Sequence, residues 1–310
     1  INVPGYMVLV AAGRLLDAYR LIKQENPFPA VCGRICTRPG EQKCRRGTTD
    51  EAIAIADIKR FVADYAYKNE KPFEQDVVFP KNGKSVAVIG AGAPGLTCAY
   101  YLVRIGYSVD VYECESVAGG VLAFGIPEYR LPNKVLAHEI ELIKQTGVNI
   151  ILNKDISRDV DFKKLKDRYD AVYIATGTQF PQKVNIPGED LPGVIHGIHF
   201  LKDVNLGQQV KLGKTVAVIG GGNTAIDSAR TALRLGAKKV IILYRRTKAA
   251  MPASEYEIHE AEAEGIEIRE LVTPVRFIAG KDGSVAQIEC IRMRLGEFDK
   301  SGRRKSVPYE

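Results

Sequence analysis

Two glycine-rich segments, 130 residues apart, have the spacing that binds dinucleotide phosphates. In this pattern the first glycine permits a tight turn, and the second lets the backbone approach a pyrophosphate. The third position, glycine or alanine, lets a helix pack closely on a strand. Two such segments predict two bound dinucleotides, and the chemistry most often built on such a pair is hydride transfer. The segments are Gly90-Ala91-Gly92-Ala93-Pro94-Gly95 and Gly220-Gly221-Gly222-Asn223-Thr224-Ala225.

The residues at the end of the next strand distinguish the two sites. Glu113 ends the strand after the first segment, where a carboxylate can accept hydrogen bonds from both ribose hydroxyls. Because an acidic group repels a 2′-phosphate, this site is predicted to bind FAD or NAD. Arg245 and Arg246 hold the corresponding place in the second site, and guanidinium groups suit bidentate phosphate contacts. The second site is therefore predicted to bind NADPH, unless both arginines are solvated or paired with nearby acids.

Strands and helices must alternate around these segments to position them, and the sequence pattern fits. An apolar, β-branched run precedes each glycine segment, and a helical pattern follows it. This alternation predicts an α/β protein with parallel, doubly wound sheets in two Rossmann-like domains. The expected strands cover residues 85–89, 108–112, 171–175, 215–219 and 239–244, with the 171–175 strand buried. The expected helices cover 95–106, 133–145, 224–235 and 255–264, and a β-rich stretch covers 266–294.

The N-terminal part of the chain is different, because it is helical with a loop-rich middle. Thr48 followed by Glu51 predicts a capping box at the start of a helix over residues 50–68. The polar stretch from Pro72 to Gly83 predicts a linker. The expected domains are a helical domain (1–80), the N-terminal part of an FAD-binding domain (81–190) and an NAD(P)H-binding domain (191–310).

Six cysteines form two groups, and neither predicts disulfides. Cys32, Cys36 and Cys44 cluster in one loop, whereas three solitary cysteines are expected to be small buried hydrophobic residues (Cys98, Cys114 and Cys290). A large, core-rich chain without a recognisable secretory signal favours a reducing cytosol. The dinucleotide region contains no close cysteine pair, which argues against a disulfide-reductase mechanism.

Composition narrows the class of protein further. The 310 residues, 45% hydrophobic and 26% charged, are typical of a soluble globular protein, and no apolar run approaches the length of a membrane span. We therefore expect a cytoplasmic location and no membrane partner. The net charge of +7 is spread along the chain without a nucleic-acid motif, which favours an anionic cofactor or an acidic protein partner. No catalytic acid, base or nucleophile is predicted, because the cofactors carry the chemistry.

Four longer stretches resemble the small (beta) subunit of bacterial glutamate synthase and related FAD- and NADPH-binding iron–sulfur flavoproteins. These relatives include the N-terminal half of dihydropyrimidine dehydrogenase and reductase subunits of some hydrogenases, formate dehydrogenases and transhydrogenases. The resemblance covers essentially the whole chain. It implies a pyridine nucleotide-disulfide reductase-like fold preceded by a small α-helical iron–sulfur-type domain. The matching stretches are residues 26–36, 119–132, 220–227, and 244–246 with Met251-Pro252.

The resemblance also implies functional residues and a partner. In the family the 119–132 stretch wraps the FAD, which implies Gly120, Leu122 and Arg130 as further flavin contacts. Electrons from NADPH would pass through FAD to a partner subunit, the glutamate synthase large subunit, for glutamate formation from glutamine and 2-oxoglutarate. The alternatives are a hydrogenase, formate dehydrogenase or ferredoxin transhydrogenase partner, or a non-catalytic nucleotide-binding fragment. The residues implied to hold NADPH are Gly222, Asn223, Thr224, Ala225, Arg245 and Arg246.

The chain departs from the family pattern at two places. The family's C-x3-C-x3-C-x3-C loop carries 4Fe-4S clusters, but here Gly40 stands between Cys36 and Cys44 at the third position. Either clusters form with atypical ligands or the domain is structural; a zinc site of the same cysteines would lack a nearby histidine. Relatives also carry cysteines upstream of Ile1 and continue past residue 310 to complete the FAD domain. The chain is therefore expected to be a fragment whose FAD domain lacks its C-terminal part.

Overall fold

A computed structural model describes residues 1–69, 79–178, 180–300 and 302–309, so the expected linker over 72–83 lies mostly outside the described residues. The chain forms two compact units. The first comprises Ile1–Ala123 and Glu128–Gly177, and the second comprises Phe124–Pro127 and Thr178–Glu310. Among the described residues, no helix combines the length and apolar composition needed to cross a membrane.

Helices form the N-terminal part of the first unit. Their core is made of apolar side chains that recur at helical spacing, with Tyr6, Ile22 and Val62 fully buried. The elements are α1 (Val3–Ala11), α2 (Leu15–Lys23), α3 (Pro29–Ile35), α4 (Pro39–Gln42), the 3₁₀ helix η1 (Arg45–Thr48) and α5 (Ile55–Asn69).

The expected capping box at Thr48 is wrong. Thr48 ends η1, where its hydroxyl donates to the carbonyl of Arg45 at 2.7 Å, and α5 begins only at Ile55. The start of α5 is instead capped from the preceding loop, because Glu41 Oε1 accepts the N–H of Ala56 at 2.7 Å. A carboxylate from outside the helix thus satisfies one of the donors that every helix start leaves unpaired.

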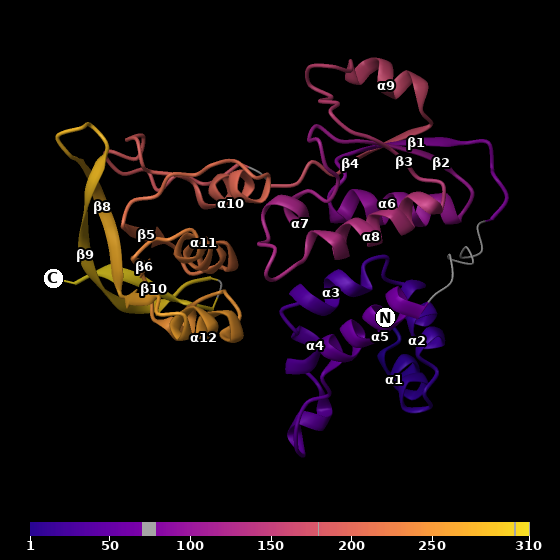
Figure 1. Cartoon of the computed structure of the whole chain (residues 1–310), viewed down its shortest axis with the longest axis horizontal. Coiled ribbons are helices and arrows are strands. Elements are labelled where there is room, and N and C mark those ends of the chain that lie inside the picture. The colour runs from indigo at the N-terminus through magenta and orange to yellow at the C-terminus, as the bar shows by residue number, and fades with distance from the viewer. Residues whose placement is uncertain (70–78, 179, 301, 310) are drawn as a thin grey trace. The chain divides into compact units, whose positions relative to one another are not determined.

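A four-stranded parallel sheet forms the rest of the first unit. Its order is β3-β2-β1-β4, so β1 is central and the carboxyl ends of β1 and β2 lie side by side. Helices α6 and α8 cover one face and α9 lies on the other (Figure 1). The strands are β1 (Ser85–Ile89), β2 (Ser108–Tyr112), β3 (Asn149–Ile151) and β4 (Ala171–Ile174), and the helices are α6 (Ala93–Arg104), α8 (Asn133–Gln145) and α9 (Phe162–Arg168).

Strand β4 is not the buried strand that the sequence predicts. Tyr173 is 43% exposed and Ile174 is 61% exposed. β4 pairs only with β1 and forms one edge of the described sheet, so its apolar side chains are covered less than those of the central strand. An apolar run alone does not distinguish an edge strand from a central one.

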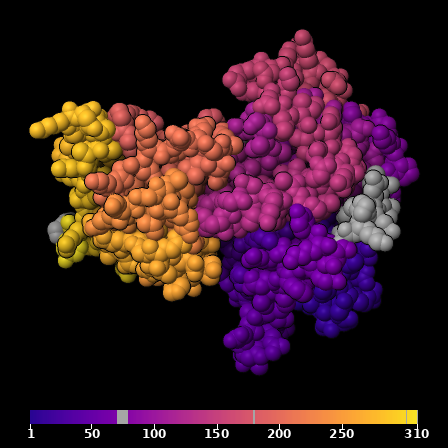
Figure 2. Space-filling model, viewed as in Figure 1, coloured from indigo at the N-terminus to yellow at the C-terminus, as the bar shows by residue number. Residues whose placement is uncertain are grey.

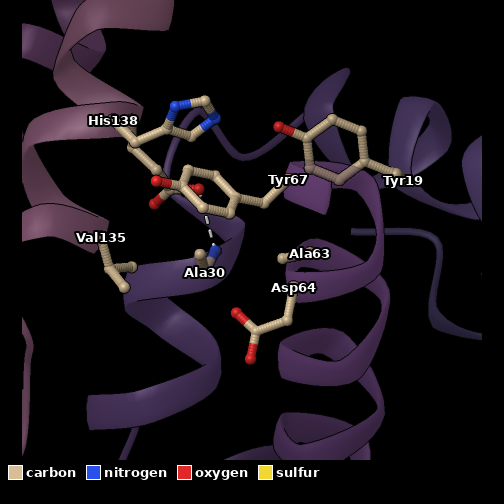
Figure 3. A pocket seen from close by; sticks show the side chains of 8 residues that line it. Tyr19, Ala30, Ala63, Asp64, Tyr67, Val135 and His138 are labelled. Atoms are coloured by element: carbon tan, nitrogen blue, oxygen red, sulfur yellow. Dashed lines mark hydrogen bonds between the residues drawn. The ribbon is translucent and has the colours of Figure 1, made fainter. Parts of the chain in front are cut away.

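A buried carboxylate joins two helices, α3 and α8, within the first unit. Glu139 of α8 is 1% exposed and accepts the N–H groups of Ala30 and Val31 at 2.9 and 3.1 Å. Burial raises the pKa of Glu139 to about 7. Beside it lies a cavity of about 20 Å³, where the rings of Tyr67 and His138 meet edge to face (Figure 3). Glu139 thus holds α3 against α8.

The second unit combines a parallel sheet with an antiparallel one. The parallel strands follow the order β5-β6-β7, and the antiparallel strands follow β10-β9-β8 (Figure 1). The strands are β5 (Thr215–Ile219), β6 (Lys239–Tyr244), β7 (Glu267–Glu270), β8 (Val272–Ala279), β9 (Val285–Phe298) and β10 (Arg304–Pro308). The helices are α7 (Val121–Phe124, shared with the first unit), α10 (Gly197–Asn205), α11 (Asn223–Arg234), α12 (Glu255–Ala263) and the 3₁₀ helix η2 (Lys248–Ala250).

An ion-pair network fastens α12 to α11. The buried guanidinium of Arg230 contacts Glu257 at 2.5 Å and Glu264 at 2.6 Å. Arg234 also contacts Glu264, and hydrogen bonds from Arg234 and Arg230 lower the pKa of Glu264 to about 2. The network explains two of the acidic residues in and after α12, because Glu257 and Glu264 face the arginines of α11 rather than solvent.

Candidate functional site

The first glycine segment is a turn that tolerates no side chain at two positions. Gly90 has φ +106°, and a Cβ there would lie 2.4 Å from the carbonyl oxygen of Ala175. A Cβ on Gly95 would lie 1.9 Å from the carbonyl oxygen of Gly90. Glycine is therefore required for the turn and for the close approach of α6 to β1.

The start of α6 leaves backbone donors for a ligand. Gly92 is the N-cap residue, and as a glycine it has no side chain to cap this helix. By contrast, the side chains of Asp161 and Ser254 cap α9 and α12. An uncapped start of a 12-residue helix, next to a glycine turn, offers N–H groups and a partial positive charge to phosphate oxygens. These residues fit the pyrophosphate of a dinucleotide.

Glu113 lies directly against this turn. It is 4% exposed, its Oε2 accepts the N–H of Ala91 at 2.8 Å, and its Oε1 accepts the N–H of Glu115 at 2.9 Å. Each carboxylate oxygen can accept more than one hydrogen bond, so Glu113 can still bind ribose hydroxyls. The structure thus gives it a second task that the sequence did not indicate, which is to hold the glycine turn. Cys114, expected to be buried, is exposed.

The 119–132 stretch reaches the same turn. Gly119 donates its N–H to the carbonyl of Ala91 at 2.8 Å, and a Cβ on Gly120 would lie 2.9 Å from Cα of Gly92. The structure therefore brings Gly120 together with the first glycine segment. Leu122 lies in α7, and Arg130 lies between α7 and α8; both are half-buried.

The second glycine segment repeats this arrangement between β5 and α11. Gly220 has φ +135°, and Gly222, which has no side chain to cap the helix, is the N-cap of α11. Ala225 is buried and takes the place of Gly95, whereas Thr224 at the helix start is exposed. The same fit to a pyrophosphate follows.

A segment after β6 supports the second turn, and sequence reasoning assigned it no role. Asn223 Oδ1 accepts the N–H of Ser254 at 3.3 Å, and the carbonyl of Gly221 accepts the N–H of Ala253 at 3.1 Å. A Cβ on Gly221 would lie 2.5 Å from the ring of Tyr244. Met251-Pro252 belongs to one of the stretches that resemble the family, but that resemblance implied no role for this segment.

The two arginines after β6 have different surroundings. Arg245 is exposed. Arg246 is 6% exposed; its Nε donates to the carbonyl of Arg304 at 2.7 Å, and its Nη2 contacts Asp299 at 3.1 Å. Of the two possibilities that the sequence left open, phosphate binding and pairing with a nearby acid, the structure shows the second for Arg246.

The three cysteines of the N-terminal loop lie on different elements. Cys32 is in α3, Cys36 follows α3 and is exposed, and Cys44 precedes η1. The stretch after α4 projects from the helical part of the unit, purple at its lower edge (Figure 2). In the part of the chain that the structure describes, no three His, Cys, Asp or Glu side chains are grouped to hold a metal ion.

The three cysteines of this loop supply one ligand fewer than the four that an iron–sulfur cluster commonly needs. Gly40 has no side chain that could ligate iron. The backbone itself leaves room for one there, because a Cβ would make only an ordinary 3.7 Å contact with Ile55. Burial raises the pKa of the Cys32 thiol, whereas backbone hydrogen bonds, above all with Ile53, lower the pKa of the Cys44 thiol, so the two thiols differ in their tendency to form a thiolate.

Similarity to known families agrees with this geometry. The family model described as "Pyridine nucleotide-disulphide oxidoreductase" matches residues 82–297, which include both glycine segments. The chain belongs to this family. A second model, described as dihydropyrimidine dehydrogenase domain II with a 4Fe-4S cluster, matches residues 1–71. The expected α/β fold with an N-terminal iron–sulfur-type domain is thus confirmed.

Relatives within this family belong to several enzymes. The NADP(+)-dependent formate dehydrogenase subunit beta of Moorella thermoacetica is 44% identical, over 99% of this chain and 47% of the relative. The NADPH-Fe(3+) oxidoreductase subunit beta of Geobacter sulfurreducens is 40% identical, over 99% and 46%. The glutamate synthase [NADPH] small chain of Escherichia coli is 36% identical, over 98% and 67%. The resemblance to the glutamate synthase small subunit is confirmed, and the chain spans about half the length of the first two relatives.

A solved structure shows the same fold at lower identity. Mycobacterium tuberculosis FprA in complex with NADPH superposes with a TM-score of 0.65 over 74% of this chain and 67% of that chain. At 21% identity, this likeness supports the fold and no more.

Proposed function

We propose that this chain is the electron-input part of an NADPH-oxidising flavoprotein reductase, with FAD on the first glycine segment and NADPH on the second. One observation carries the proposal. The two turns share the same backbone arrangement, yet the strand beside the first ends on buried Glu113 and the strand beside the second ends on exposed Arg245. Opposite charges at equivalent positions suit a ribose with free hydroxyls and a ribose with a 2′-phosphate.

In this proposal the chain's own residues bind and orient. Gly90, Gly92 and Gly95 shape the first turn, and the N–H groups at the start of α6 hold the FAD pyrophosphate. Glu113 holds the turn and accepts the ribose hydroxyls, while Gly120 closes the same end of the site. When bound, NADPH supplies a hydride and FAD accepts it, so no protein acid, base or nucleophile is required.

The second site divides its work in the same way. Gly222, Asn223, Thr224 and Ala225 form the turn and the helix start for the NADPH pyrophosphate, and Arg245 contacts the 2′-phosphate. Asn223 also ties the turn to Ser254, which fixes the path of the loop after β6. A charged donor on phosphate forms a stronger hydrogen bond than a neutral one.

The electron acceptor is proposed as a protein subunit. Relatives include a formate dehydrogenase subunit beta, an NADPH-Fe(3+) oxidoreductase subunit beta and a glutamate synthase small chain, and each of these names describes one subunit of a larger enzyme, which supports a protein partner. The glutamate synthase large subunit is one member of this class. The final substrate is then determined by that partner.

An anaerobic visible spectrum tests the proposal. The purified chain is incubated with FAD, separated from free flavin, and titrated with NADPH and, in parallel, with NADH. We expect a bound flavin band that NADPH bleaches at lower concentration than NADH. A chain that binds no flavin, or a flavin that neither nucleotide bleaches, would contradict the proposal and favour a nucleotide-binding fragment without turnover.

A further inference from the structure

The end of β6 is connected to a hairpin far along the chain. Arg246 follows β6, and its guanidinium reaches the β9–β10 hairpin, where Nη2 contacts Asp299 Oδ2 at 3.1 Å and Nε contacts the carbonyl of Arg304 at 2.7 Å. Figure 1 shows the antiparallel strands beside the sheet that contains β6. Arg246 is 6% exposed, so these contacts replace the water that a free guanidinium would keep.

Asp299 is itself held in place. Its Oδ1 accepts the N–H of Arg303 at 3.2 Å, while its own N–H donates to the carbonyl of Arg303 at 2.7 Å. One carboxylate oxygen therefore fixes the hairpin turn and the other holds Arg246. A buried arginine that loses its acidic partner keeps an uncompensated charge, and the surrounding backbone has to rearrange to hydrate it.

Arg245, the neighbour of Arg246 in the chain, is exposed to solvent, and the backbone around both residues is held by further hydrogen bonds. Arg246 accepts the N–H of Leu271 at 3.2 Å through its carbonyl, and the N–H of Lys248 donates to Glu270 at 2.6 Å. With Arg246 anchored, the peptide on either side has little freedom, and exposed Arg245 projects from a fixed point. A phosphate ligand on a fixed backbone loses less entropy on binding than one on a mobile loop.

We propose that Asp299 is a positioning residue for nucleotide specificity, which holds Arg246 so that Arg245 meets the 2′-phosphate of NADPH. This inference rests on the proposed function and adds a residue 53 positions away from Arg246. Arg246 is then an anchor for the site, and Arg245 is the phosphate ligand. The opposite role would make Asp299 a competitor that withholds Arg246 from the phosphate, and its removal would then tighten binding.

Equilibrium binding of half-nucleotides tests this without flavin or turnover. Calorimetric titrations compare 2′,5′-ADP, which carries the 2′-phosphate, with 5′-AMP, which lacks it. Asp299→Asn and Arg246→Gln should each weaken 2′,5′-ADP by about 10-fold and change 5′-AMP by less than about twofold. The double variant should be no weaker than either single variant, because both remove the same pair.

A matched control lies in the same antiparallel strands. Glu289 pairs with Arg276 across β8 and β9 in an exposed ion pair, so Glu289→Gln should leave both affinities unchanged. If Asp299→Asn does not fold, Arg246→Lys keeps the positive charge but loses the two-point hold, and the same loss of discrimination is expected.

The outcomes separate the two proposals. Equal or tighter binding of 2′,5′-ADP by a folded Asp299→Asn or Arg246→Lys variant would overturn the role of Asp299 while leaving the NADPH site intact. Failure of the unaltered chain to prefer 2′,5′-ADP over 5′-AMP would overturn the 2′-phosphate site and the inference together. The flavin titration reports separately on the reductase.

Discussion

The two glycine turns of this chain have the same backbone arrangement but differ in what stabilises them. The first turn is tied to the acid at the end of its neighbouring strand, since Glu113 accepts the N–H of Ala91. The second turn is tied to the segment after β6, through Asn223 and Gly221. This difference leaves the second strand end free to carry a positive charge. A turn held by a carboxylate at that position could not also present an arginine to a phosphate.

The two turns also differ in how closely the helix approaches. A Cβ on Gly95 would lie 1.9 Å from a carbonyl oxygen, whereas Ala225, its equivalent in the second turn, carries one. Likewise, a Cβ on Gly90 would lie 2.4 Å from a carbonyl oxygen, whereas one on Gly220 would have its nearest neighbour at 3.4 Å. The first turn is therefore the tighter of the two.

The largest effect is expected from giving each turn the residue type of the other at the position where helix and strand pack, that is, Gly95→Ala and Ala225→Gly. Gly95→Ala should destabilise the first unit by about 3 kcal/mol or more and abolish FAD retention, because the turn has no room for a methyl group. Ala225→Gly should cost only about 1 kcal/mol, from helix propensity. Urea unfolding and flavin content check both. Equal costs for the two variants would break the distinction between the turns.

The next effect concerns the positive side of the charge difference. Arg245→Ala should raise the KM for NADPH by about 10- to 100-fold and leave that for NADH within about twofold, since only NADPH loses a charge-assisted bond. Steady-state kinetics with both nucleotides measure this. Arg276→Ala, at an exposed arginine on β8, is the matched control and should change neither. Equal effects of Arg245→Ala on both nucleotides would remove the 2′-phosphate assignment.

A similar effect is expected on the acidic side. Glu113→Ala should weaken FAD binding by about 10-fold or more, because it leaves the buried N–H of Ala91 unpaired and removes the ribose acceptor. Glu113→Gln keeps an acceptor and should lose less. Flavin retained after gel filtration measures both, with Glu141→Gln on the exposed face of α8 as the control. Unchanged retention in Glu113→Ala would contradict the account of the first site.

The last effect concerns pH, to which the two units should respond oppositely. The folded pKa of Glu139 is raised to about 7, so its contribution to the first unit is present at low pH and lost as pH rises through 7. The folded pKa of Glu264 is lowered to about 2, so its contribution to the second unit is present above its ordinary value and lost as pH falls through 2. Hydrogen exchange in α8 and α12 against pH reports on each, and Gln variants should flatten the profiles.

Sequence patterns predicted the local features of this protein well. Gly90 and Gly95 meet backbone requirements that no other residue meets, so the first turn could be placed without a structure. The alternation of strands and helices could also be predicted, because a strand that is buried on both faces needs a run of apolar residues. Such features depend on residues that are close in sequence.

Long-range partners could not be predicted in this way. The anchor of Arg246 is an aspartate 53 residues further on, and the cap of α5 is Glu41 rather than the expected Thr48. Neither contact has a local signature, because any of many acids could have reached the same donors. The exposure of β4 likewise depends on what lies beside it and not on its own apolar residues.

Hydrogen–deuterium exchange with each ligand added separately tests the central claim most directly. FAD should protect peptides that cover residues 90–96 and 113–124, and NADP⁺ should protect peptides that cover 220–226 and 244–249. Protection of the second set by FAD, of the first set by NADP⁺, or of one set by both ligands would contradict the assignment of the acidic and basic strand ends to different nucleotides.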